Sequence, residues 1–180
     1  MTEPARYVAR EDLSRALELL AAGRDIVAPR REGGAVAFRP WRSGEPLGTE
    51  RSTASPKEVL FPQSETLFSY TRSKDPEDAG RSSLRLEPAR PGQPTLLFGC
   101  RPCDARGVAV LDQVFLEGPY RDPYYAARRE ATLVAALACE HPESTCFCHW
   151  TGGGPDGTAG SDLLLAACGD GYVVRAVTGR

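Results

Sequence analysis

Two short apolar runs, Thr95–Gly99 and Thr132–Ala138, dominate the hydrophobic pattern of this chain. Both runs lack charge and are rich in Leu and Val, which is typical of buried strands. The segment between them shows helical periodicity from Asp104 to Phe115, and a second short helix is predicted to begin at Asp122-Pro123. Strand, helix and strand at this spacing predict a parallel βαβ unit.

The N-terminal pattern predicts one helix followed by a hairpin. Apolar residues recur at helical spacing over Arg10–Ala22, and Gly23 follows where a helix commonly ends. The runs Asp25–Arg31 and Ala35–Trp41 are strand-like and are joined through Gly33-Gly34. We expect this portion to form an α+β layer that supports the βαβ core.

The middle of the chain is polar and rich in turn residues. Ser43–Lys57 is predicted to be a surface loop, and prolines on both sides of Val59–Phe61 suggest a brief extended segment. Ser64 is a suitable N-cap for a short helix that would carry Leu67, Phe68 and Tyr70. The alternating segment Arg81–Pro88 indicates an exposed edge strand.

The C-terminal pattern predicts a long glycine-rich loop followed by a hairpin. The loop spans Glu140–Gly160, and the strands are Asp162–Ala167 and Tyr172–Val177. The predicted fold is mixed α/β, with a small central sheet around a parallel βαβ core. We expect a single domain over residues 1–180, in which residues 1–90 support the cysteine-bearing residues 91–180.

Composition excludes several classes of protein. The chain has 180 residues, a formal net charge of −2 and 41% hydrophobic residues, so a packed core is expected and non-specific nucleic-acid binding is not. No apolar run approaches the roughly 20 residues of a membrane span. The N-terminus lacks the apolar core of a secretory signal, so we expect a cytoplasmic protein. In a reducing cytosol, clustered cysteines more often bind metal or carry out redox chemistry than form disulfides.

Four of the six cysteines are predicted to meet at one edge of the sheet, because the carboxyl ends of neighbouring parallel strands lie side by side. Scattered thiolates of this kind are typical ligands of iron–sulfur clusters. Cys100 ends the first strand and is a possible alternate ligand, whereas Cys168 is expected to be a small buried thiol. The four predicted ligands are Cys103, Cys139, Cys146 and Cys148.

Two other uses of these cysteines stay open on the residues alone. A structural zinc site is one, although a single residue between Cys146 and Cys148 is unusual for a zinc knuckle. A thiol–disulfide redox protein that uses Cys100 and Cys103 is the other, and it requires a lowered thiol pKa. His141 and His149 lie near the thiols, but with four cysteines available we do not expect them to be ligands.

The surroundings of the predicted ligands also suit a cluster. Arg101 and Arg106 are placed to offset the negative charge of thiolates, and Asp104 is placed to stabilise the positive end of the following helix. Phe147 and Trp150 are placed to exclude water, which tunes the potential of a cluster.

The segments GCRPCDARGVAVLDQVF, DPYYAARRE, ACEHPESTCFC and GSDLLLAACGDGYVV resemble the iron–sulfur β subunits of sulfhydrogenase-type hydrogenases. They are also similar to the A subunit of anaerobic sulfite reductases, and the earlier SPKEVLFPQSETLFSY resembles the N-terminal portion of the same family. The most specific pieces are R-P-C-D at Arg101–Asp104 and C-x-x-P-x-x-x-C-F-C at Cys139–Cys148.

This resemblance implies a non-catalytic electron-transfer subunit. Such subunits relay electrons between a flavin-containing, NAD(P)H-reactive partner and a catalytic metal subunit. The motif cysteines match the four selected from their spacing, so one [4Fe–4S] cluster is expected. Family members usually continue into a ferredoxin-like region, but no C-x2-C-x2-C-x3-C motif occurs here, so the chain is either truncated or a naturally short member.

Overall fold

The computed structural model describes residues 5–78, 80–89 and 93–180. Within these residues, seven strands form one sheet in the order β1-β9-β8-β7-β6-β2-β3. The central neighbours β2, β6, β7 and β8 run parallel, and the outer strands pair antiparallel. The bounds are β1 Arg6–Ala9, β2 Asp25–Glu32, β3 Ala35–Trp41, β6 Thr95–Cys100, β7 Thr132–Leu137, β8 Leu163–Cys168 and β9 Gly171–Ala176.

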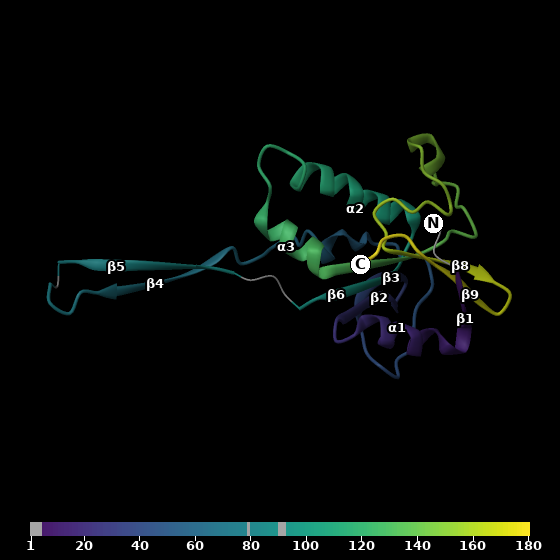
Figure 1. Ribbon diagram of the computed structural model, residues 1–180, viewed down its shortest axis with the longest axis horizontal. Helices are drawn as coiled ribbons and strands as arrows, with labels where there is room; N and C mark the ends of the chain where they lie inside the picture. Colours follow the sequence, from purple (N-terminus) through teal and green to yellow (C-terminus); the bar gives the residue numbers. More distant parts are fainter. Residues whose placement is uncertain (1–4, 79, 90–92) are drawn as a thin grey trace.

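Helices cover both faces of this sheet, with α1 on one face and α2 and α3 on the other (Figure 1). The helix bounds are α1 Leu13–Ala21, α2 Pro102–Phe115 and α3 Pro123–Ala131, and short 3-10 helices span Arg10–Asp12 (η1), Pro56–Val59 (η2) and Cys148–Thr151 (η3). The mixed α/β fold and the parallel β6–α2–β7 unit predicted from the apolar pattern are therefore confirmed.

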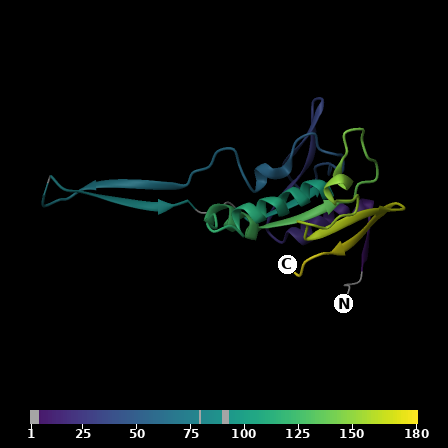
Figure 2. The same ribbon diagram turned by 90° about the horizontal axis from the view of Figure 1, so that it is seen from above.

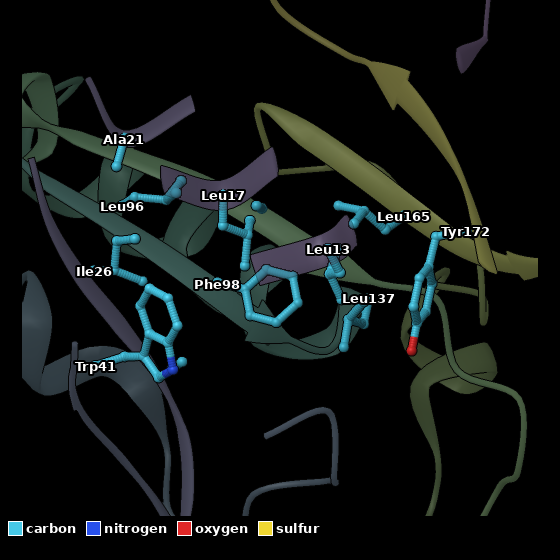
Figure 3. Close-up of a cluster of buried hydrophobic side chains, with 12 residues drawn as sticks. Leu13, Leu17, Ala21, Ile26, Trp41, Leu96, Phe98, Leu137, Leu165 and Tyr172 are labelled. Carbon is cyan, nitrogen blue, oxygen red and sulfur yellow. The ribbon is translucent and has the colours of Figure 1, made fainter. Parts of the chain in front are cut away.

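Alternation along the buried strands divides the core between the two faces. Leu96 and Phe98 of β6 pack with Leu17 of α1, while Leu97 and Cys100 pack on the α2 face. Figure 3 shows the α1 side, where Leu17, Leu96 and Phe98 lie together. A register shift between Phe98 and Cys100 allows Cys100 to follow Leu97 onto the α2 face.

The N-terminal hairpin belongs to the same sheet as the βαβ unit. β2 pairs antiparallel with β3 and also parallel with β6, with Ile26 opposite Leu96. Because Ile26 and Ala28 are buried against α1, joining the sheet removes more apolar surface from water than a separate layer would. The N-terminal residues thus extend the central sheet and cover one of its faces.

The structure corrects three local predictions, two of them between η2 and β4 and one in α2. Val59–Phe61 is not extended, because Val59 belongs to the 3-10 helix η2 and Leu60 continues with helical backbone angles. Leu60 is fully buried against α2 and α3. No helix follows Ser64; Phe68 and Tyr70 instead alternate with polar residues in a strand, as a period of two requires. The helical periodicity over Asp104–Phe115 also predicts that Val114 lies on the inner side of α2, but Val114 is 60% exposed.

A separate two-stranded hairpin projects from the body of the molecule (Figures 1 and 2). It consists of β4 Phe68–Lys74 and β5 Ser82–Pro88, which confirms the exposed strand predicted over Arg81–Pro88. The base of the hairpin is attached to α3, where Tyr124 donates a hydrogen bond to the Leu67 carbonyl and Arg128 forms an ion pair with Glu65. Among the described residues, no helix is long and apolar enough to cross a membrane.

Candidate metal centre

A cavity of about 930 Å³ opens at the carboxyl ends of β6 and β7. Its wall is formed by the start of α2, the residues after β7, the loop over residues 140–160 and one residue from the loop after β3. The cavity therefore lies at the sheet edge where the sequence places the predicted ligands. The residues of interest that line it are Cys103, Cys139, Cys146, Cys148, Arg51, Arg101, Arg106 and Phe147.

The start of α2 positions Cys103. Pro102 occupies the first turn of the helix, where its missing N–H costs no hydrogen bond. The carboxylate of Asp104 accepts a hydrogen bond of 3.0 Å from the backbone N–H of Arg101, which fixes the entry into the helix. Asp104 thus lies in the first turn of α2, where it was expected, and Cys103 is exposed and lines the cavity.

Backbone hydrogen bonds hold the long loop in place around Cys139 and Cys148. The N–H of Cys139 donates to the Pro155 carbonyl at 2.8 Å, and the N–H of Gly153 donates to the Cys148 carbonyl at 2.9 Å. Gly160 closes the loop onto α2 at a positive φ of 79°, where a Cβ would lie 1.9 Å from the Ala105 carbonyl oxygen. Only glycine permits this close approach.

Cys146 lies in the most polar surroundings of the four thiols. Its sulfur accepts hydrogen bonds of 3.2 Å from Arg51 Nη1 and of 3.2 Å from the backbone N–H of Glu143. These two donors, the backbone N–H first, lower the pKa of the Cys146 thiol and favour the thiolate. Arg51 Nη1 also lies 3.4 Å from the carboxylate of Glu143, which holds its guanidinium at the cavity wall.

Arg101 links three parts of the cavity wall. Its guanidinium donates to the carbonyls of Ala138, at 3.1 Å, and of Thr49, at 2.9 Å. Its Nε is buried and has no hydrogen-bond partner in the part of the chain that the structure describes. Arg51, Arg101 and Arg106 all line the cavity, so a negatively charged group inside it would lie near three guanidinium groups. Four thiols as ligands, together with this positive charge, fit a thiolate-ligated cluster.

The structure brings the four predicted ligands around one cavity but does not bring them into contact. Over residues 5–78, 80–89 and 93–180, no group of three or more His, Cys, Asp or Glu side chains is close enough to hold a metal ion. Of the aromatic pair expected to exclude water, Phe147 lines the cavity but is more than half exposed, and Trp150 is 83% exposed. His149 also lines the cavity.

The two remaining cysteines differ from each other in burial. Cys100 is fully buried on the α2 face of the sheet, whereas Cys168, expected to be buried, is exposed where β8 ends before the turn to β9. Burial raises the pKa of the Cys100 thiol, and partial desolvation of its sulfur raises that of the Cys103 thiol. A raised pKa disfavours the thiolate form that a dithiol redox centre uses.

Arg51 lines the cavity and contacts a predicted ligand, but it was not among the predicted site residues. It lies in the segment Ser43–Lys57, which was assigned as a surface loop because it is polar and rich in turn residues. The segment is indeed without helix or strand over most of its length, but it crosses to the edge of β6 and β7. A single sequence carries no signal that pairs Arg51 with a thiol 95 residues away.

The fold and the cavity define a mixed α/β protein with a cysteine-lined cavity at the carboxyl edge of its parallel strands. Among curated proteins, the sulfhydrogenase 2 subunit beta of Pyrococcus furiosus is 27% identical to this chain over 152 residues. The match covers 83% of this chain and confirms the resemblance to a sulfhydrogenase β subunit. It covers 41% of the relative, so the chain spans about two fifths of the length of that protein. No family model and no solved structure matches the chain.

Proposed function

We propose that this chain is a non-catalytic electron-transfer component of an oxidoreductase complex and that it carries one [4Fe–4S] cluster. The observation that supports this most directly is that four thiols from two segments of the chain, the first turn of α2 and the connection after β7, line one cavity together with three arginines. Similarity to a protein named as a sulfhydrogenase subunit supports the same class of function.

Cys103, Cys139, Cys146 and Cys148 would hold the cluster, whose chemistry when bound is reversible one-electron transfer. Three of the four belong to the end of β7 and the loop that follows it, and Cys103 belongs to the first turn of α2. Because the thiols are not within ligand distance of one another, the loop over residues 140–160 would have to adjust to bind the cluster. Metal binding would therefore be coupled to the conformation of that loop.

The other residues of the cavity act on charge and solvation. The guanidinium groups of Arg51, Arg101 and Arg106 balance the negative charge of four thiolates, and the backbone N–H of Glu143 donates to the Cys146 sulfur. Hydrogen bonds to the sulfurs and nearby positive charge are the levers by which a protein raises a cluster's reduction potential.

The proposed partners are a flavin-containing, NAD(P)H-reactive subunit and a catalytic metal subunit of the hydrogenase or sulfite/sulfur reductase type. The cavity suits transfer to such partners because Cys103 and Phe147, which line it, are exposed. The chain's role in that complex is to bind the cluster and present it at the sheet edge.

The test is the metal and sulfide content of anaerobically purified protein, read together with its visible spectrum. About four irons and four acid-labile sulfides per chain support the proposal. One zinc per chain without iron assigns the thiols to a structural zinc site and contradicts it. An intact fold without any metal contradicts it as well.

A further inference from the structure

The stretch between β3 and η2, residues 42–55 and here called the crossing segment, meets β2 at a very close contact. A Cβ added to its Gly48 would lie 1.9 Å from the carbonyl oxygen of Pro29 in β2, far inside any allowed separation. The backbone of Gly48 is not in the left-handed region, so the close approach is the reason that this position needs glycine.

The contact lies where β2 and β6 separate. The parallel register between these strands ends at Val27 opposite Leu97, and Pro29 follows with no backbone N–H to continue the ladder. Gly99 of β6 also contacts Pro29, since a Cβ at Gly99 would lie 2.7 Å from the proline Cδ. Two glycines therefore let β6 and the crossing segment approach the same proline near the carboxyl end of β6.

Two further attachments hold the crossing segment on either side of Arg51. Before it, the Thr49 carbonyl accepts a hydrogen bond of 2.9 Å from Arg101 Nη2 at the start of α2. After it, the Thr53 N–H donates to the Val36 carbonyl at 2.8 Å, and the Val36 N–H donates to Thr53 Oγ1 at 3.2 Å. Because residues 42–55 contain no helix or strand, these contacts of its neighbours set the position of Arg51.

A side chain at Gly48 would move the crossing segment away from the cavity. An ordinary contact begins at 3.4 Å, so a Cβ placed at 1.9 Å must shift by about 1.5 Å together with the backbone that carries it. The obstacle is the Pro29 backbone, which cannot rotate aside as a side chain can. Arg51 follows three residues later, and its hydrogen bond of 3.2 Å to the Cys146 sulfur does not tolerate a displacement of that size.

We infer that Gly48 is a positioning residue of the candidate metal centre: it lets the crossing segment reach the carboxyl edge of β6 and so places Arg51 at the Cys146 sulfur. Gly48 itself does not line the cavity, so it acts through Arg51. The inference rests on the proposed function for the identity of the metal, whereas the link between Gly48 and Arg51 is a property of the chain alone.

The test compares Gly48→Ala, Arg51→Ala and the double variant, each in the full chain. Gly34→Ala is the matched control, because Gly34 lies in the turn between β2 and β3, where an added Cβ meets nothing within 4 Å. Two quantities are measured, namely the iron retained against a chelator and the hydrogen–deuterium exchange of residues 140–148 in the metal-free chain. The exchange reports local opening of that loop independently of any metal.

Both single variants should bind iron about 10- to 100-fold less tightly, which is the usual effect of losing a contact that supports a ligand. Exchange of residues 140–148 should rise by about 10-fold in both, because each variant loses the charged donor that ties Cys146 to the crossing segment. The double variant should be no worse than either single variant, since its second change removes a contact that is already lost. The control should match the wild type.

Wild-type behaviour of Gly48→Ala in both measurements overturns the inference. Losses that multiply in the double variant overturn it too, because Gly48 would then act independently of Arg51. Exchange over β6 should stay unchanged, and an equal rise there would show that Gly48 serves the fold as a whole and not Arg51. A wild type without iron contradicts the proposed function instead, and exchange in the metal-free chain still decides whether Gly48 acts through Arg51.

Discussion

Arg51 Nη1 donates a hydrogen bond of 3.2 Å to the sulfur of Cys146, although 95 residues separate the two in the sequence. The contact ties the loop after β3 to the loop after β7 at the wall of the cavity. The same guanidinium pairs with Glu143, whose backbone N–H is the second donor to that sulfur. Two loops of different origin thus converge on one thiol.

Substitution Arg51→Ala should weaken metal retention and lower the reduction potential of the bound cluster. The variant loses one donor to the Cys146 sulfur and one positive charge at the cavity wall. Loss of such supporting contacts typically costs about 10- to 100-fold in metal affinity. Iron content and a potentiometric titration measure both effects. Arg31→Ala, which removes an exposed arginine paired with Glu50, is the control and should leave both values unchanged.

The iron content of single cysteine variants should distinguish the ligand cysteines from Cys100 and Cys168. Replacing any one of the four cavity cysteines should strongly reduce iron content, because the thiolate ligand is lost. Cys168→Ser should retain full iron content, since Cys168 is exposed at the last position of β8 and does not line the cavity. Cys100→Ala should retain iron but unfold at a lower temperature, because Cys100 packs in the buried core. Loss of iron in Cys100→Ala would make Cys100 a ligand and contradict the assignment.

Substitution Gly160→Ala should displace the loop over residues 140–160 and reduce metal retention. The added Cβ would meet the Ala105 carbonyl at 1.9 Å, and alanine disfavours the positive φ of 79°. The backbone strain alone costs about 1–3 kcal/mol. Gly169→Ala is the matched control, because its φ is 59° but a Cβ there meets nothing within 4 Å. Equal metal loss in both variants would show that strain alone, and not the contact with α2, explains the result.

Substitution Leu17→Ala should destabilise the fold by about 2–5 kcal/mol, the usual cost of truncating a buried leucine. Leu17 is fully buried between α1 and the sheet, next to Leu96 and Phe98 (Figure 3). Leu19→Ala on the same helix is the control, since Leu19 is 74% exposed. Urea denaturation of both variants measures the difference. A similar stability for the two would contradict the proposed packing of α1.

Much of the body was predictable because its pattern is strongly periodic. The short uncharged runs at β6 and β7 are typical of buried strands, and the helical segment between them provides the crossover that their parallel pairing requires. The edge of the sheet at which the cavity lies could also be predicted, because Cys103 and Cys139 come within a few residues of the carboxyl ends of those strands. Local pattern was therefore sufficient for the position of the cavity.

The projecting β4–β5 hairpin and the contact between Arg51 and Cys146 could not be predicted from local pattern alone. Ser64 is a good N-cap, but the alternation of Phe68 and Tyr70 with polar residues decided in favour of a strand. Arg51 reaches Cys146 only because the chain returns to the β6 edge after β3, and such long-range proximity leaves no trace in residue order. The exposure of Cys168 depends likewise on where β8 ends, which pattern predicts to within a few residues.

The most direct test of the electron-transfer claim is low-temperature EPR of the anaerobic protein during a cycle of chemical reduction and reoxidation. We expect the reduced protein to show a signal that integrates to about one spin per chain and disappears on reoxidation, as is typical of a [4Fe–4S] carrier. The spectrum should be lost in any of the four cavity-cysteine variants. A protein that remains silent throughout the cycle, or that changes only by forming a disulfide, would contradict the account.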